Sequence, residues 1–144
     1  MNENAELHDG EIELDDAREL IWRNVNPNWV DGGKLSSQAF RPTPKDVGKL
    51  SGAREGKVTA DKHFHEFTNE FALASSGVWA VTVDEARRVE VRCVYDAESE
   101  SKPEPCPTGH TYLDYRVHGN SKIRRIGSAL RDFAEERGRQ HPHP

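Results

Sequence analysis

The sequence predicts an α+β domain, with a sheet of about five strands and two helices packed on it. Two segments, 60–74 and 122–137, repeat apolar residues at helical spacing, and shorter alternating or wholly apolar segments are typical of strands. The chain has 144 residues, the usual size of one domain. We therefore expect a single domain over residues 14–138, with a mobile tail at 1–13 and a second tail at 139–144.

Two strands are predicted near the N-terminus. A helical turn is expected at Asp15–Arg18, followed by a strand at Glu19–Val25, where apolar and polar residues alternate. Asp31-Gly32-Gly33 is a strong turn signal. A second strand is then expected over Lys34–Phe40, ending at Arg41-Pro42 because proline fixes its own backbone and restricts the residue before it.

The first helix is predicted over Ala60–Ala74, with Thr59 as its N-cap and a glycine at position 77 after its end. Its aromatic residues repeat at helical spacing, so we expect them to face the core; they are Phe64, Phe67 and Phe71.

Three strands are predicted after this helix. Val78–Val83 is apolar on both faces, which is typical of a central strand buried on both sides. One helical turn at Asp84–Arg88 precedes an alternating strand at Val89–Tyr95. Asp96–Thr108 is acidic and rich in serine and proline, so it should be a long exposed loop. A last alternating strand is expected at His110–Val117.

The final helix is predicted to begin at Ser121, its N-cap. Its Leu130 and Phe67 of the first helix are expected to share one core. Trp79 and Val81 of the apolar strand should join them there.

Charge argues against one class of function. The net charge is −5, and general nucleic-acid binders are usually basic. Basic residues gather around the start of the last helix, so nucleic-acid contact there stays an alternative to an ordinary solvated helix face; they are Arg116, His118, Lys122, Arg124, Arg125 and Arg131.

The sequence predicts a soluble, cytoplasmic protein with no membrane partner. No basic N-terminal region is followed by an apolar run, so no signal peptide is expected. No apolar segment is long enough to cross a bilayer. Cys93 and Cys106 are too few for a disulfide scaffold, which favours a reducing compartment.

The loop at residues 36–51 is the best candidate binding site. Two prolines stiffen it, and Arg41 can form a bidentate fork to an anion while Lys45 supplies a point charge. Ser36, Ser37 and Thr43 would add hydroxyl donors. The alternative is that Arg41, Lys45 and the neighbouring aspartate only brace the loop through ion pairs.

Two groups of residues have the side chains that metal binding or acid–base chemistry needs, but no metal is predicted. His63, Glu66 and Glu70 share one face of the predicted helix and could act as ligands or as an acid–base pair, but a solvated polar face explains them as well. Cys93, Cys106 and His110 lack the close spacing of zinc ligands. Cys93 fits a small buried hydrophobe, and no third group orients a Cys106–His110 pair.

Two resemblances can be stated on particular motifs. The run Ser37–Asp46 (SQAFRPTPKD), followed by Gly77–Val83 (GVWAVTV), resembles small uncharacterised bacterial proteins. This resemblance covers most of residues 20–117 and implies a bacterial cytoplasmic origin, with no function attached.

The second resemblance is to mono-ADP-ribosyltransferases, which have an arginine on the first core strand, a serine-containing strand and a Glu-x-Glu turn. This chain has Arg23, Ser36-Ser37 and Glu98-Ser99-Glu100 in that order, with a shorter spacing from arginine to serine and no Ser-x-Ser. The resemblance implies that Arg23 and Ser36 hold NAD and that Glu100 stabilises the ribose cation.

Our first interpretation is a recognition domain, without a cofactor, that binds an anionic ligand or a protein partner through loop 36–51. The alternative enzyme would use NAD, and the third possibility is nucleic-acid contact. Catalysis predicts a deep cleft bordered by Arg23, Ser37 and Glu100, whereas binding predicts a shallow basic surface around Arg41 and Lys45.

Overall fold

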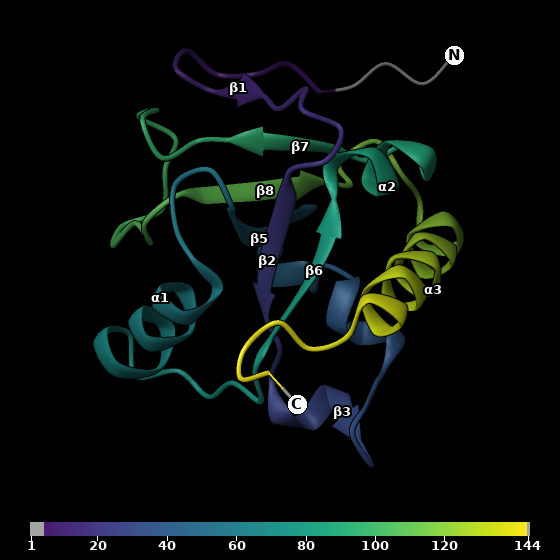
Figure 1. Ribbon diagram of the computed structural model, residues 1–144. Helices are drawn as coiled ribbons and strands as arrows, with labels where there is room; N and C mark the ends of the chain where they lie inside the picture. Colours follow the sequence, from purple (N-terminus) through teal and green to yellow (C-terminus); the bar gives the residue numbers. More distant parts are fainter. Residues whose placement is uncertain (1–4, 144) are drawn as a thin grey trace.

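The computed structural model describes residues 5–143, and it is an α+β fold as predicted. Its main sheet is antiparallel, with strand order β1-β7-β8-β5-β2-β6 (Figure 1). These strands are β1 (Ile12–Glu13), β2 (Leu20–Asn24), β5 (Lys49–Arg54), β6 (Val78–Thr82), β7 (Arg92–Tyr95) and β8 (His110–Asp114). A small hairpin pairs β3 (Val30–Asp31) with β4 (Lys34–Leu35). The helices are α1 (Ala60–His65), α2 (Val83–Arg88) and α3 (Asn120–Arg137).

Helices cover both faces of the sheet. α2 and α3 pack on one face, where Ile21, Val81 and Leu113 from the strands meet Leu130 of α3 in the larger core. α1 lies on the other face (Figure 1), over a smaller cluster of Trp22, Ala53, Val58, Val78 and Ala80. We call these the α3 face and the α1 face.

The strand predicted at Glu19–Val25 is confirmed as β2, but the second predicted strand is mostly wrong. The predicted strand Lys34–Phe40 pairs only at Lys34–Leu35, and a 3₁₀ turn follows at Ser37–Phe40. The Ser36 hydroxyl accepts a hydrogen bond from the backbone N–H of Gln38 (3.1 Å), which caps this turn and stops the strand. The predicted helical turn at Asp15–Arg18 is instead a plain turn.

The first helix starts as predicted, with the Thr59 hydroxyl accepting from the Lys62 N–H (3.1 Å). After His65 it widens into a π-helical segment, Glu66–Glu70, instead of continuing as an α-helix to Ala74. α1 and its π-helical continuation lie on the face of the sheet opposite α3. Phe67 therefore lines a cavity on the α1 face, and the prediction that it shares a core with Leu130 is wrong.

The strand β6 is buried on both faces as predicted, but it is the edge of the sheet and not its centre. The chain end covers this edge, because Val78 N–H donates to His141 O (2.8 Å) and Gln140 N–H donates to Val78 O (2.7 Å). The predicted C-terminal tail is therefore paired at residues 140–141. The predicted N-terminal tail likewise includes β1, whose Ile12 pairs with Tyr95.

The last helix begins earlier than the sequence suggests, at Asn120. Gly119 is the N-cap of α3, and Ser121 lies inside the helix. In the described chain, no helix is both long and apolar enough to span a membrane.

Candidate active site

A cavity of about 530 Å³ opens beside α1, between the sheet and the loop that precedes β8. Most of its wall is apolar. It comes from Trp29 of the 3₁₀ turn before β3, from the π-helical segment and the chain after it, and from the proline-rich loop at residues 96–108. The apolar residues are Trp29, Phe67, Phe71, Leu73, Ala74, Pro103, Pro105 and Pro107. The polar side chains on its wall are few: Arg23, Asn24, Asn26, Ser51, His63 and His110. An apolar hollow with a few converging polar groups is the usual form of a small-molecule site.

Three neighbouring strands bring together a serine and a histidine on this wall and a buried aspartate behind the histidine. Ser51 is in β5 and His110 begins β8, and the register pairs Ala53 with His110. Ser51 therefore lies two residues along β5 from the partner of His110, and both side chains lie on the α1 face. Asp96 directly follows β7, the strand on the other side of β8.

The three side chains form a hydrogen-bonded series. His110 Nδ1 is 2.6 Å from Asp96 Oδ1, and His110 Nε2 is 3.1 Å from Ser51 Oγ. An ionised carboxylate can only accept a hydrogen bond, so Nδ1 of His110 carries the hydrogen. In the neutral ring, Nε2 is then the acceptor for the serine hydroxyl. Asp96 and His110 are buried, whereas Ser51 is exposed to the cavity. This is the arrangement of an orienting acid, a general base and a nucleophile.

Local backbone geometry fixes the histidine. Gly109, immediately before it, has φ +70°, and a Cβ there would lie 3.0 Å from Lys57 Cβ. Its carbonyl accepts from the Arg54 N–H (3.0 Å), which joins the end of the proline-rich loop to β5. Glycine is required at this turn, because other residues rarely adopt that backbone conformation.

His63 of α1 adds a second imidazole to the cavity wall. It is 6% exposed, and its Nδ1 has no hydrogen-bond partner in the described part of the chain. Burial lowers the pKa of His63 to about 4, so the ring is neutral at pH 7. A buried polar atom without a partner is costly, and such atoms are commonly satisfied by a bound molecule or water.

Arg23 supplies the positive charge of the cavity. Its Nε donates to Ala39 O (2.6 Å) and its Nη1 to Ser51 O (2.8 Å). Its third nitrogen, Nη2, has no partner within residues 5–143. Burial lowers the pKa of Arg23 to about 10, which still leaves it charged at neutral pH. The arginine thus holds β5 beside the nucleophile and keeps one donor group free.

The proline-rich loop is held against the π-helical segment. Both carboxylate oxygens of Glu66 accept hydrogen bonds from Thr108, one from its N–H and one from its hydroxyl (2.7 Å each). Glu66 is therefore bound to the loop, whereas Glu70 is exposed and His63 is buried. The predicted solvated face of His63, Glu66 and Glu70 is wrong, since the helix changes its geometry after His65.

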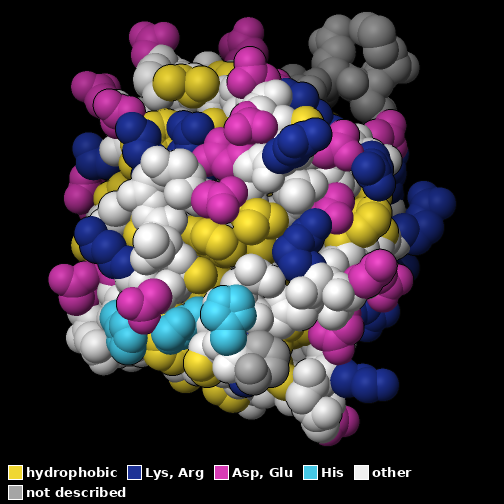
Figure 2. All heavy atoms as spheres, in the orientation of Figure 1, with side chains coloured by type: hydrophobic (Ala, Val, Ile, Leu, Met, Phe, Trp, Pro, Cys, Tyr) yellow, Lys and Arg dark blue, Asp and Glu magenta, His cyan; other side chains and the backbone are white. Residues whose placement is uncertain are grey.

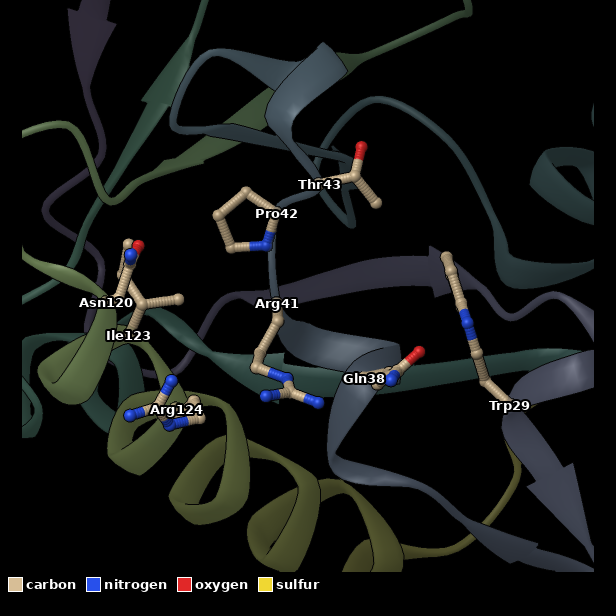
Figure 3. A pocket seen from close by; sticks show the side chains of 8 residues that line it. All are labelled: Trp29, Gln38, Arg41, Pro42, Thr43, Asn120, Ile123 and Arg124. Atoms are coloured by element: carbon tan, nitrogen blue, oxygen red, sulfur yellow. The ribbon is translucent and has the colours of Figure 1, made fainter.

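A second, smaller cavity of about 320 Å³ lies where loop 36–51 meets the start of α3 (Figure 3). Arg41 extends from the loop toward α3, and Arg124 approaches from the helix. Neither guanidinium has a hydrogen bond or ion pair to another described residue. Gly127 leaves room for the arginine, since a Cβ there would lie 2.3 Å from Arg41 Cγ.

The loop residues predicted to bind a ligand divide between two roles. Arg41 and Thr43 line the smaller cavity, whereas Ser36 caps the 3₁₀ turn and Lys45 is exposed outside the cavity wall. Asp46 braces the loop by accepting from the Thr43 N–H (2.6 Å).

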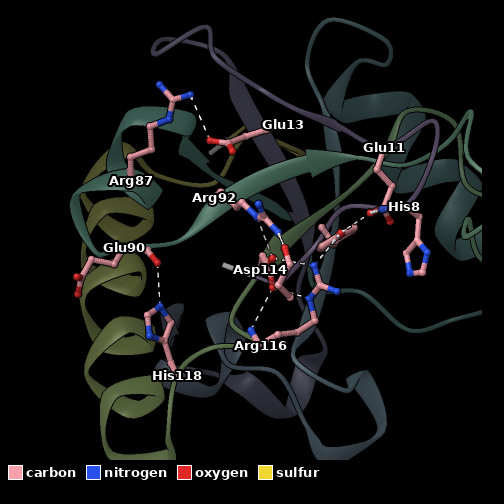
Figure 4. Close-up of polar contacts among 11 residues, drawn as sticks. His8, Glu11, Glu13, Arg87, Glu90, Arg92, Asp114, Arg116 and His118 are labelled. Atoms are coloured by element: carbon pink, nitrogen blue, oxygen red, sulfur yellow. Dashed lines mark hydrogen bonds and ion pairs between the residues drawn. The ribbon is translucent and has the colours of Figure 1, made fainter. Parts of the chain in front are cut away.

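Three residues of the predicted basic patch form ion pairs within the chain: Arg116, whose contacts Figure 4 shows, Lys122 and Arg131. Buried Asp114 binds both Arg116 (2.8 Å) and Arg92 (3.0 Å). Hydrogen bonds from Arg116 hold the pKa of Asp114 below its ordinary value despite burial. Lys122 pairs with Glu90, His118 Nε2 lies 2.8 Å from Glu90 O, and Arg131 pairs with Asp132.

The other predicted site residues lie apart. Arg23 lines the larger cavity, but Ser37 and Glu100 do not, so these three do not border one cleft. Cys93 is fully buried in the α3-face core, as predicted, and burial raises its pKa to about 12. Cys106 lies in the proline-rich loop, where its thiol contacts Pro107 O (3.4 Å).

Comparison with known proteins adds no assignment: no family model, curated protein or solved structure matches this chain. From the sequence, His110 is only a candidate zinc ligand or partner of Cys106, and its contacts with Asp96 and Ser51 are not predicted. The strand register places Asp96 and Ser51 beside it, and only the order of β7, β8 and β5 in the sheet could have indicated this.

Proposed function

We propose that the larger cavity is the active site of a serine hydrolase that cleaves esters or thioesters of apolar acids. The single observation behind this proposal is the hydrogen-bonded series from Ser51 and His110 on the cavity wall to the buried Asp96 behind them. A buried aspartate on Nδ1 selects the tautomer whose Nε2 accepts the serine proton.

The reaction would proceed in two halves. His110 Nε2 takes the proton of the Ser51 hydroxyl while Ser51 Oγ bonds to the acyl carbon. The bond to the leaving alcohol or thiol then breaks, and His110 returns the proton to that group. Water next attacks the acyl-serine with His110 as base, and the acid leaves with Ser51 restored.

Two further groups on the wall suit the charge that develops. The acyl oxygen becomes negative in the tetrahedral intermediate, and preorganised donors stabilise such an oxyanion. Arg23 offers a free Nη2, and neutral His63 offers an unpartnered Nδ1 within the described chain. The apolar wall fits a substrate with a hydrocarbon or aromatic acyl group.

A covalent probe and an ester series test this proposal. A fluorophosphonate should label the native protein, and peptide mass analysis should place the adduct on Ser51. Hydrolysis of p-nitrophenyl butyrate and octanoate should fall at least a thousandfold in Ser51→Ala and in His110→Ala. The matched control is Ser37→Ala, which changes a serine outside the cavity and should keep full activity.

The same variants test the NAD-using alternative. Release of nicotinamide from NAD that depends on Glu100 and Ser37, together with no labelling of Ser51, would overturn the hydrolase and support ADP-ribosyl chemistry. The hydrolase predicts that Glu100→Gln behaves like the wild-type protein, because Glu100 is exposed and does not line the larger cavity.

A second candidate function is anion binding in the smaller cavity, favoured by the two unpaired guanidinium groups of Arg41 and Arg124. Phosphate should then raise the melting temperature beyond a chloride control, because it binds only the folded state. Arg41→Gln with Arg124→Gln should remove this increment, and Lys45→Gln should keep it. Equal increments in all three proteins would exclude the site.

We also propose the cytoplasm as the location of the protein. Two free cysteines, one of them in the core, are compatible with a reducing compartment.

A further inference from the structure

Three potential metal ligands meet on the surface between α1 and the C-terminal segment. They are Asp61, His65 and His141, whose ligand atoms all lie within 4.8 Å of one another. Figure 2 shows histidine side chains gathered on this part of the surface, near an acidic side chain. The hydrolase site uses none of these residues.

The cluster joins two residues of α1 to one residue of the C-terminal segment. Asp61 and His65 are one helical turn apart on α1, so their side chains are neighbours. His141 comes from the other end of the chain and is fixed by the pairing of its backbone with Val78 of β6. Its ring packs against Phe64, with 4.8 Å between ring centroids, which orients the imidazole.

The distances suit a tetrahedral ion. With zinc–ligand bonds of about 2.0–2.1 Å, two ligand atoms of a tetrahedron lie about 3.3 Å apart. Asp61 Oδ1 is 3.1 Å from His65 Nε2 and 3.6 Å from His141 Nδ1. The two histidine nitrogens lie within 4.8 Å of each other, and rotation of the exposed His65 and Asp61 side chains can adjust this distance.

We propose that Asp61, His65 and His141 bind a divalent zinc-class ion with two imidazoles and one carboxylate. Water completes the coordination, as is usual where a protein supplies three ligands. The bound ion joins the C-terminal segment to α1, the helix that carries His63 of the larger cavity. It therefore acts as a structural link, independent of whether the cavity hydrolyses esters.

The test uses the untagged full chain and zinc itself. Titration followed by calorimetry should show one zinc per chain, and Co²⁺ should give the visible absorption of a tetrahedral site. Asp61→Asn should lower the zinc affinity at least tenfold. This variant is well suited to the test because Asp61 is exposed, and replacing an exposed carboxylate should leave the fold intact. His141→Ala should lower the affinity at least as much.

Two matched controls separate a built site from general histidine binding. His143→Ala and His8→Ala each remove an exposed histidine that is not in the cluster, and both should bind zinc like the wild-type protein. Zinc should also raise the melting temperature of the wild type and not that of Asp61→Asn. No zinc binding, or equal binding by Asp61→Asn, would show only an ion pair between Asp61 and His65 and overturn the proposal.

Discussion

The two faces of the sheet differ in how completely they are filled. On the α3 face, strand side chains meet α2 and α3 in a continuous core, and Val81 and Leu130 are fully buried. On the α1 face, a short helix covers a small cluster and leaves a cavity of about 530 Å³ beside it. Stability and candidate chemistry are thus separated by one layer of backbone, so changes on one face should leave the other largely intact.

The largest effect on stability is expected on the α3 face. Trp79→Ala removes a side chain that is 4% exposed in the α3-face core, and it should lower the free energy of unfolding by about 3–5 kcal/mol. Denaturant unfolding measures this loss as a lower midpoint. A midpoint equal to that of the wild type would mean that the α3 face is not the main core.

The buried residues of the α3 face were also easier to predict from the sequence than those of the α1 face. Apolar periodicity identified Trp79, Val81 and Leu130, because burial against a helix imposes a spacing that the sequence records. On the α1 face, the spacing of apolar residues does not indicate which side chains line the cavity. Phe67 repeats at helical spacing like a core residue, yet its helix lies on the α1 face, where Phe67 lines the cavity. Ser51 and Asp96 are distant from His110 in sequence, and strand order alone brings them together.

The stability of the protein should depend on pH through His63 on the α1 face. His63 has a pKa of about 4 in the folded protein because it is buried, and about 6.5 when unfolded. Between these values the unfolded chain binds a proton that the folded chain does not. Stability should therefore fall by about 3 kcal/mol as pH drops from about 6.5 to about 4, and this loss is absent above that range.

Unfolding midpoints measured across this pH range give the slope. His63→Gln should flatten it, whereas the control His8→Gln, at an exposed position, should keep it. Equal slopes for the wild type and His63→Gln would show that the imidazole is protonated in the folded state, and the cavity would then be wetter than its burial indicates.

The next effect concerns the edge that both faces share. A chain ending at Gly138 loses the three hydrogen bonds between residues 140–141 and Val78, whose side chain is fully buried. We expect a loss of about 2–3 kcal/mol in unfolding free energy, at about 1 kcal/mol for each hydrogen bond. A chain ending at Pro142 keeps all three bonds and serves as the control. If both chains unfold like the wild type, the C-terminal segment does not protect β6.

The smallest effect on stability is expected from Phe67, an aromatic residue on the α1 face. Its replacement by alanine makes the sharpest comparison with Trp79→Ala. Phe67 is half-buried and belongs to neither core cluster, so Phe67→Ala enlarges a cavity that is already open instead of creating a closed one. The unfolding free energy should fall by about 1 kcal/mol or less. If the cavity binds acyl groups, the same variant should lose more activity toward p-nitrophenyl octanoate than toward the butyrate, since the longer chain depends more on apolar contact. A large loss of stability would place Phe67 in a core after all, and an unchanged preference between the two esters would remove it from the substrate wall.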